Sequence, residues 1–481
     1  MSSVKALNHQ SEHGRRLLLT ALIVAPFLSA AGYYFFQRTL IPNPDSACYL
    51  DWCPIRTSIY PLFLRIAAGP LLLPLQLLLL SLAVSWASFY VYQVSRSLPL
   101  AALLCAALLA NPYVWRLQAS ILSEALTTPL LIIMSGLLVG YLTRKCQWLV
   151  LTSSLLAGVL IATRPSNLPL IAISPMAVFL TPGHSRATKL QLAILCGAFS
   201  LTLVIADRLC TWAVHGREAT SLLGRHTFAK SVLIDAPPVA SRGLDPIESR
   251  LAILQQRDFR PIRSVLRSVA RRPDIVDILQ ANYEACLQYT CTDEAVSDIT
   301  TDRPKLDAAL FRVGFARLRE NPAAYLSLSV SEYRRLWLLD PRKDPALARE
   351  FNSYLRSVGS LPLQEQLGAS AQPVPSSEPF RLQSFLRGGF IVLGYAVGLL
   401  TLVLGMLRVH RATPPLVTAA FIFLTATEAV LMLCALLGIG TPRYTMGMWP
   451  LIATAFVLLF NVVLDGTGRP MSMRIGHKEQ S

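Results

Sequence analysis

Carboxylates, an arginine and two tyrosines are concentrated in a short loop that follows the first long apolar run of the chain. The loop contains Asp45-Ser-Ala-Cys-Tyr49, then Asp51, then Arg56-Thr-Ser-Ile-Tyr60-Pro-Leu-Phe-Leu64. A carboxylate can take a proton from a nucleophile, and an arginine can hold the phosphate group of a substrate. If the chain is a membrane protein, this loop lies at one face of the membrane and favours chemistry there.

The composition identifies the class of protein. Of the 481 residues, 53% are hydrophobic and only 15% are charged, which is typical of a polytopic membrane protein. The apolar runs predict an all-α bundle of about ten transmembrane helices, with an uncertainty of one or two because several runs are short for a span. The predicted spans are Leu17–Phe36, Leu71–Tyr92, Leu98–Trp115, Ile121–Leu142, Trp148–Ala162, Leu168–Leu180, Leu190–Ala206, Gly388–Leu407, Leu416–Leu437 and Met446–Leu464.

Basic residues orient the predicted bundle. With the N-terminus inside, the short loops and tails on the cytoplasmic side carry most of the lysines and arginines, as the positive-inside rule requires. Both termini are therefore predicted to be cytoplasmic, and the net charge of +16 follows from topology, with no surface that indicates a nucleic-acid partner. Arg15-Arg16 before an apolar run also resembles a cleavable signal peptide, but the run is longer than such peptides use, so an uncleaved anchor is expected.

The predicted domains follow from this topology. Residues 1–206 form the N-terminal membrane bundle with the outer loop 38–70, residues 388–464 form the C-terminal membrane helices, and residues 465–481 form a cytoplasmic tail. Residues 207–387 form a mainly helical extracytoplasmic domain, in which Leu326, Val330, Tyr333 and Trp337 follow a helical apolar stripe. A second stripe, around Ile262, carries several arginines that either contact anionic membrane lipids or an anionic acceptor, or form a solvated face.

Four cysteines form two pairs of the same spacing on the predicted outer side. They are Cys48 with Cys53 and Cys286 with Cys291, and disulfides are permitted in an extracytoplasmic compartment. A zinc site is the poorer interpretation, because further Cys or His ligands at zinc spacing are absent.

Further polar groups are predicted at the same face as the first outer loop. Glu124 begins the fourth predicted span, Arg164 follows the fifth, and Arg443-Tyr444 precedes the last. Because charges at membrane depth are costly, several at one level indicate a polar cavity that opens outward. The alternative is that Glu124 and Arg164 only pair with each other to fasten helices.

These residues carry a resemblance to the GT-C superfamily of membrane glycosyltransferases, especially to bacterial relatives of the family 39 mannosyltransferases. The chain resembles them in Asp45-Ser-x-x-Tyr49 with Tyr60-Pro-Leu-Phe-Leu64, in Leu122-Ser-Glu124-Ala-Leu126, in Thr163-Arg164-Pro165 and in Pro442-Arg443-Tyr444. The motifs are short, and their order and common side carry the resemblance from the first span to the last.

The resemblance implies an enzyme of the bacterial inner membrane that takes a sugar from a polyprenyl-phosphate donor. It makes Asp45 the general base and Glu124 a second carboxylate of the site. The residues expected to hold the substrate and its phosphate are Arg56, Tyr60, Arg164, Arg443 and Tyr444. No nucleotide cofactor is expected, and a divalent metal is left open, as are the sugar and whether the acceptor is a lipid, a glycan or a protein.

The chain also departs from the family pattern. The first loop lacks an adjacent Asp-Glu pair, and Thr57-Ser-Ile stands where relatives often have Pro-Gly before the Tyr-Pro. The large domain between late spans argues against close kinship with the oligosaccharyltransferase branch. Two alternatives stay open: an O-antigen ligase or polymerase, which would use residues such as Arg225-His226, and a transporter or flippase, for which internal repeats would be expected.

Overall fold

The protein is described here by a computed structural model. It describes residues 2–42, 45–67, 69–216, 222–234, 236–237, 239, 244–257, 291–337, 380–410, 414–438 and 442–466. These residues form helices and no β-strand, so the predicted all-α class is confirmed. The arginine-rich stripe around Ile262 lies outside the described residues.

The chain divides into two compact units. The first, the bundle, comprises Met1–Glu218, Val397–Val430 and Met446–Ser481, and the second comprises Ala219–Ala396 and Leu431–Thr445. The predicted boundary at residue 206 falls inside a helix that continues to His215. The last turns of α21 (Pro415–Leu437) belong to the second unit, while its first turns belong to the bundle.

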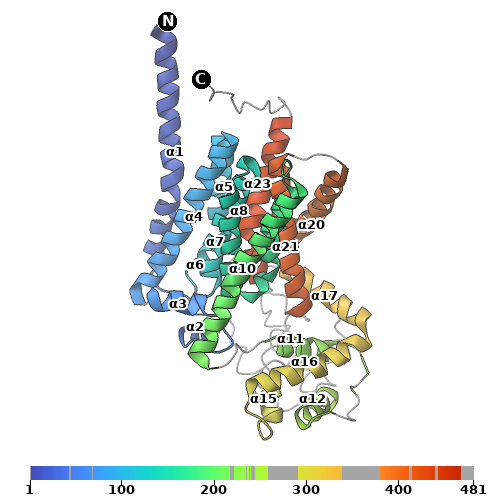
Figure 1. The fold of residues 1–481 in the computed structure, drawn as a ribbon. Coiled ribbons are helices and arrows are strands. Elements are labelled where there is room, and N and C mark those ends of the chain that lie inside the picture. Colours follow the sequence, from blue (N-terminus) through green and yellow to red (C-terminus); the bar gives the residue numbers. More distant parts are fainter. Residues whose placement is uncertain are drawn as a thin grey trace. The chain divides into compact units, whose positions relative to one another are not determined.

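The bundle is built from long apolar helices joined by short ones (Figure 1). The first outer loop forms two short helices, α2 (Ser46–Leu50) and α3 (Ile59–Ile66). The other elements that lie in the bundle are α1 (Ser2–Phe36), η1 (Gly69–Leu71), α4 (Leu72–Ser95), α5 (Leu98–Leu109), α6 (Pro112–Gln118), α7 (Glu124–Arg144), α8 (Gln147–Thr163), η2 (Pro165–Ala172), α9 (Ile173–Leu180), α10 (Arg186–His215) and α23 (Trp449–Gly466). Three helices, α20 (Phe380–His410), α21 (Pro415–Leu437) and α22 (Pro442–Gly447), are divided between the two units.

Five helices in the described part of the chain are long and apolar enough to cross a membrane. They are found in Arg16–Phe36, Gly69–Ser95, Glu124–Arg144, Arg186–His215 and Pro415–Leu437, and the pair α5 and α6 would make a sixth. That pair is bent by 60°, because Asn111 caps α6 and Pro112 cannot continue the preceding helix. The other four predicted spans are helical but shorter, so the count of about ten is not confirmed.

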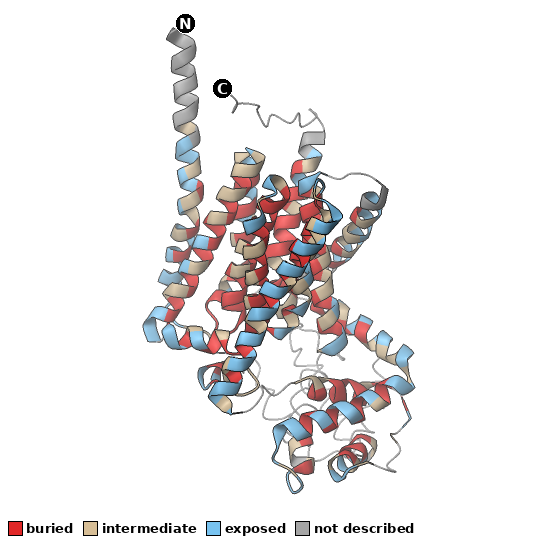
Figure 2. Cartoon of the chain, in the orientation of Figure 1, coloured by how far each residue is buried: buried red, intermediate tan, exposed pale blue. Residues whose placement is uncertain are grey.

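Burial distinguishes the central helix of the bundle from the peripheral ones. Figure 2 shows α7 buried along most of its length, whereas α1 and α10 carry exposed residues over long stretches. The exposed side chains include Leu17, Leu18, Ile194 and Ile205, which is the pattern of helices whose outer faces contact lipid.

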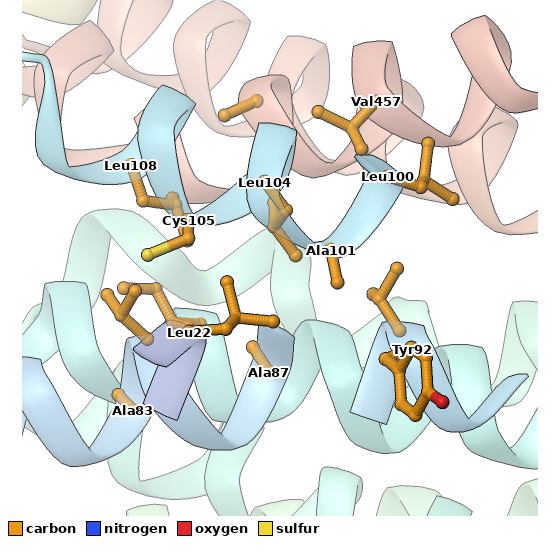
Figure 3. Close-up of a cluster of buried hydrophobic side chains, with 14 of the residues drawn as sticks. Leu22, Ala83, Ala87, Tyr92, Leu100, Ala101, Leu104, Cys105, Leu108 and Val457 are labelled. Carbon is orange, nitrogen blue, oxygen red and sulfur yellow. The ribbon is translucent and has the colours of Figure 1, made fainter. Parts of the chain in front are cut away.

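Small residues let the central helices approach closely. A side chain at Gly136 or Gly140 of α7 would collide with Trp86 or Tyr90 of α4, whose rings stack with centroids 5.0 Å apart. Side chains of α1, α4, α5 and α23, with Ile132 of α7, meet in one apolar cluster (Figure 3). Leu22, Ala87, Leu104 and Val457 represent the four helices in this cluster. The packing fixes the ends of these helices, where the polar residues lie.

The second unit is a smaller helical assembly. Its helices are α11 (Leu223–Leu233), α12 (Pro246–Arg257), α15 (Cys291–Val296), α16 (Arg303–Glu320) and α17 (Pro322–Leu336). Helices α11 and α16 cross closely, because Gly224 lies against the backbone of Asp307 and a Cβ at Gly314 would be 2.7 Å from the backbone nitrogen of Phe228. The Asp307 carboxylate accepts hydrogen bonds from the backbone N–H groups of Gly224 (3.3 Å) and Arg225 (3.2 Å), so it caps the start of α11.

Candidate functional site

The first outer loop is fastened to one end of the bundle. Figure 1 shows α2 and α3 at the end where α1 and α10 finish and α4 begins. The hydroxyl of Ser46 donates to the backbone oxygen of Ile121, just before α7, and that of Thr57 donates to the backbone oxygen of Thr163, at the end of α8, both at 3.1 Å. These bonds bring the loop to the termini that carry Glu124 and Arg164.

Asp207 of α10 holds the centre of the loop. Its carboxylate accepts the backbone N–H of Ser58 at 2.6 Å, and the Ser58 hydroxyl reaches the backbone oxygen of Asp207 at 3.1 Å and the hydroxyl of Thr211 at 2.7 Å. All three residues are buried. The carboxylate and the backbone oxygen of Asp207 thus both bind Ser58, and these buried bonds anchor the loop between α1 and α4 to α10.

Asp45 is paired with Arg56 inside the loop. Nη2 of Arg56 lies 2.5 Å from Oδ1 of Asp45, and the guanidinium carbon lies 4.6 Å from the centre of the Tyr49 ring. Both charged side chains keep some exposure, 25% for Asp45 and 17% for Arg56. The pair is therefore open to a ligand from one side and held by an aromatic face on the other.

A second pair lies deeper and is connected to the first. Oε1 of Glu124 lies 2.7 Å from Nη1 of Arg164, and both side chains are buried. The Tyr49 hydroxyl donates to Ser123 at 3.1 Å, and the Ser123 hydroxyl donates to Oε2 of Glu124 at 3.2 Å. A continuous chain of contacts thus runs from the partly exposed Asp45 to the buried Arg164.

Tyr60 lies beside this chain. Its ring meets the ring of Tyr49 edge to face, with centroids 5.0 Å apart, and its hydroxyl accepts a hydrogen bond from Gln76 at 3.2 Å. Burial raises the pKa of Tyr60 and of Tyr49. Both phenols therefore stay protonated at neutral pH and act as hydrogen-bond donors, not as bases.

Gly447, at the junction of α22 and α23, leaves space beside the deeper pair. A Cβ at this position would lie 3.6 Å from Nη1 of Arg164 and 4.0 Å from Cγ of Glu124. These are ordinary contact distances, so one methyl group would fit and a larger side chain would reach the pair.

The electrostatics of the cluster suit a substrate that carries both a hydroxyl and a phosphate. Each carboxylate is paired with one guanidinium, so the net charge of the site is close to zero before a substrate binds. The site can therefore accept an anion although neither guanidinium is unpaired in its absence. The Nε–H of Arg56 is buried and finds no acceptor among the described residues. This donor is available to a ligand oxygen.

Five of the predicted site residues therefore gather at one end of the bundle: Asp45, Arg56, Tyr60, Glu124 and Arg164. Arg443 and Tyr444 belong to the second unit, where the guanidinium carbon of Arg443 lies 5.9 Å from the centre of the Tyr444 ring. Because they are in a different compact unit from Glu124, their part in that site stays a prediction.

The cysteines of the loop are joined. Cys48 and Cys53 form a disulfide that closes a small ring between α2 and Arg56. The other predicted pair, Cys286 with Cys291, lies outside the described residues because Cys286 does.

A divalent metal would need oxygen or nitrogen ligands in a group. Among the described residues no three or more His, Cys, Asp and Glu side chains gather in that way. In the cluster, both candidate carboxylates are already engaged by arginines. This donor set does not fit a metal ion.

The sequence does not indicate the residues that hold the loop in place. Trp52 has a positive φ of 48° and is buried, with the Arg65 guanidinium 4.8 Å and the His215 ring 5.8 Å from its ring. The sequence places Asp207 at the start of the extracytoplasmic domain, whereas this residue lies within α10. Ser123 and Tyr49 were visible only as parts of motifs, and their adjacency depends on tertiary folding.

No protein-family model matches the chain, and neither curated proteins nor solved structures give a match.

Proposed function

We propose that this chain is an integral-membrane glycosyltransferase that moves a sugar from a polyprenyl-phosphate donor to an acceptor on the extracytoplasmic face. The observation that carries the proposal is the chain of contacts from Asp45 through Arg56, Tyr49 and Ser123 to Glu124 and Arg164. It combines a partly exposed carboxylate with two arginines at one end of a membrane bundle. A transferase with a phosphate leaving group needs these groups together.

In the proposed reaction, the acceptor hydroxyl attacks the anomeric carbon of the donor sugar. Asp45 takes the hydroxyl proton while the new glycosidic C–O bond forms and the bond to the carrier phosphate breaks on the opposite side. The bonding pair leaves with the phosphate oxygen, and Arg56 and Arg164 stabilise the charge that develops there. Glu124 positions Arg164, Tyr49 holds Ser123 and the Arg56 guanidinium in place, and the protonated phenol of Tyr60 offers a hydrogen bond to a sugar oxygen.

The proposal includes a topology of about ten spans in the bacterial inner membrane, with both termini in the cytoplasm. In this arrangement the four shorter apolar helices also cross the membrane, with neighbouring helices satisfying the backbone groups freed at their ends. Reporter fusions at Arg144 and Thr188 are expected to be cytoplasmic, and fusions within Gly243–Pro304 to be external. The opposite pattern would move the whole cluster to the side where nucleotide sugars are available and would remove the reason for a lipid-linked donor.

The function is tested by lipid analysis in a strain that lacks the gene for this chain. A polyprenyl-phosphate sugar is expected to accumulate, and the wild-type gene is expected to remove it. Asp45→Asn keeps the size of the side chain but not its basicity, so it is expected not to complement. Asp51→Asn, which changes the other, exposed carboxylate of the same loop, is the matched control and is expected to complement. No change in carrier lipids on deletion would reject the donor.

The ligase alternative would place essential groups at Arg225-His226 in the second unit. Arg225 is buried, and its Nη1 lies 2.9 Å from Oδ1 of Asp293. This arginine holds α11 and α15 together, which favours the bundle cluster over the second unit as the reacting site.

A further inference from the structure

The second unit contains a cavity that the proposed reaction does not use. It has a volume of about 360 Å³ and is formed by α11, α16, α17 and the last residues of α21. Pockets of this size hold small molecules or parts of larger ones. All of its lining residues belong to the second unit.

The wall of the cavity is apolar. Phe311 and Phe315 stack along α16 with ring centroids 5.7 Å apart, and Leu436 and Leu437 also line the cavity. Phe315 is 52% exposed and Leu437 is 42% exposed. Large apolar side chains around an open hollow leave surface that an apolar ligand would cover.

Two cations accompany the apolar wall. Lys230 is buried, and its ammonium group donates to the backbone oxygens of Ala435 and Leu436, while the Tyr325 hydroxyl donates to the same Leu436 oxygen at 2.7 Å. Arg319 is exposed at the edge, 3.9 Å from Glu320. Lys230 is thus tied to the end of α21, and Arg319 is the cation that a headgroup in water can reach.

The position of Leu436 and Leu437 indicates the source of the ligand. They are the final residues of a helix that is long and apolar enough to span a membrane. A cavity whose wall is the end of such a helix lies at the level where a span leaves the bilayer, so a lipid chain can enter it without crossing water.

We propose that this cavity binds one alkyl chain of an anionic membrane lipid, with its headgroup at Arg319. The apolar wall takes the place of neighbouring lipid chains, and the arginine attracts the negative headgroup. The site is independent of the sugar-transfer cluster, because no residue of that cluster lines it. Bound lipid would hold the second unit at the membrane surface.

The test uses the full chain in phosphatidylcholine vesicles that contain a trace of phosphatidylglycerol with a photoreactive diazirine on one acyl chain. After irradiation, adducts are mapped by mass spectrometry and are expected on the segments of α16 and α11 that line the cavity. The same diazirine on phosphatidylcholine is expected to give ~5-fold fewer adducts, the difference that one surface arginine makes. Arg319→Gln is expected to abolish that difference between the two lipids.

Leu437→Trp is expected to fill the cavity and to lower the amount of lipid adduct by ~10-fold. This factor corresponds to the binding free energy of about two methylene groups of the lipid chain that no longer enter the cavity. The matched control is Ile253→Trp, a similarly exposed position on α12 (49%) that does not line the cavity, and it is expected to label like the wild type. If Leu437→Trp does not fold, Phe315→Asp at a half-exposed position replaces it. Adducts spread evenly over the second unit would overturn the site, and so would an unchanged amount of adduct in a folded Leu437→Trp or Phe315→Asp variant. Equal labelling of the wild type by both lipids would overturn the headgroup preference.

Discussion

The polar end of the bundle and the crossing of α11 with α16 use buried charges in different ways. In the crossing, each charge completes a local structure: Asp307 caps α11, Arg225 pairs with Asp293, and Lys230 binds the last carbonyls of α21. In the bundle, two ion pairs are joined by Tyr49 and Ser123 into one chain of contacts. That chain begins at a partly exposed carboxylate.

This difference separates a structural charge from a candidate catalytic one. A charged side chain that caps a helix or joins two helices has its polar contacts satisfied within the protein. Asp45 and Arg56 are tied to each other and to a ring, and they retain exposure. We therefore expect substitutions in the crossing to change stability alone. In the bundle cluster we expect substitutions to change the rate of sugar transfer by an amount that does not follow their effect on stability.

The largest expected effect comes from breaking the deeper pair. Arg164→Met leaves the buried carboxylate of Glu124 without its partner, which costs about 3–5 kcal/mol of stability. The double variant Glu124→Gln with Arg164→Met removes both charges and is expected to recover most of that loss. The measurement is thermal unfolding of the purified variants in detergent.

The same double variant distinguishes the two interpretations of the pair. If the pair only fastens helices, the double variant recovers sugar transfer together with stability. The proposed function predicts that stability returns while transfer stays low, because Arg164 no longer stabilises the leaving phosphate.

The next effect compares two glycines. Gly224→Ala puts a methyl group onto the backbone of Asp307 at the crossing and is expected to cost about 1–3 kcal/mol of stability. Gly447→Ala fits at ordinary contact distance from Arg164 and Glu124, so its unfolding midpoint is expected to match that of the wild type. Gly447→Phe is expected to lower both stability and transfer, because Gly447 is buried and the ring would press on the pair. A larger stability loss in Gly447→Ala than in Gly224→Ala would contradict the geometry of both sites.

The gathering of Asp45, Glu124 and Arg164 was predictable from the sequence, because alternating spans return to the same face and each residue stands at the end of an apolar run. The hydrogen bonds that fix the loop were not. Ser58 and Asp207 are 149 positions apart, and nothing local to either residue indicates the other. The sequence also leaves the number of spans open, because Pro112 and Pro169 lie inside apolar runs that read as single helices, Leu98–Trp115 and Leu168–Leu180.

The second unit shows a different limit of the sequence. The stripe of Leu326, Val330, Tyr333 and Trp337 correctly indicates a helix, α17, but Leu326 and Val330 are exposed, while Ser329 and Glu332 are buried. Periodicity finds a helix, but which face is covered depends on its neighbours. The Glu332 carboxylate forms an ion pair with Arg335 at 3.2 Å, which balances its negative charge on that face.

The smallest expected effect is a pH dependence of the second unit. Burial lowers the pKa of Lys230 to about 8, below its value in the unfolded chain, so the folded state releases the proton first and stability is lost as pH falls through that range. Between pH 8 and 9 the unfolding free energy is expected to rise by about 1 kcal/mol. Lys230→Met is expected to remove this rise, and the exposed control Lys305→Met to keep it. An identical pH profile in Lys230→Met and the wild type would show that this ammonium group titrates normally.

The most direct test of the central claim is the transfer rate of purified Asp45→Asn with a polyprenyl-phosphate sugar donor. The substitution keeps the shape of the side chain and one acceptor oxygen for Arg56 but removes the basicity. The rate is therefore expected to fall by at least ~10²-fold, with an unfolding midpoint like that of the wild type and with Asp51→Asn fully active. Transfer by Asp45→Asn at the wild-type rate would contradict the account, since the carboxylate at the open end of the cluster would then take no proton.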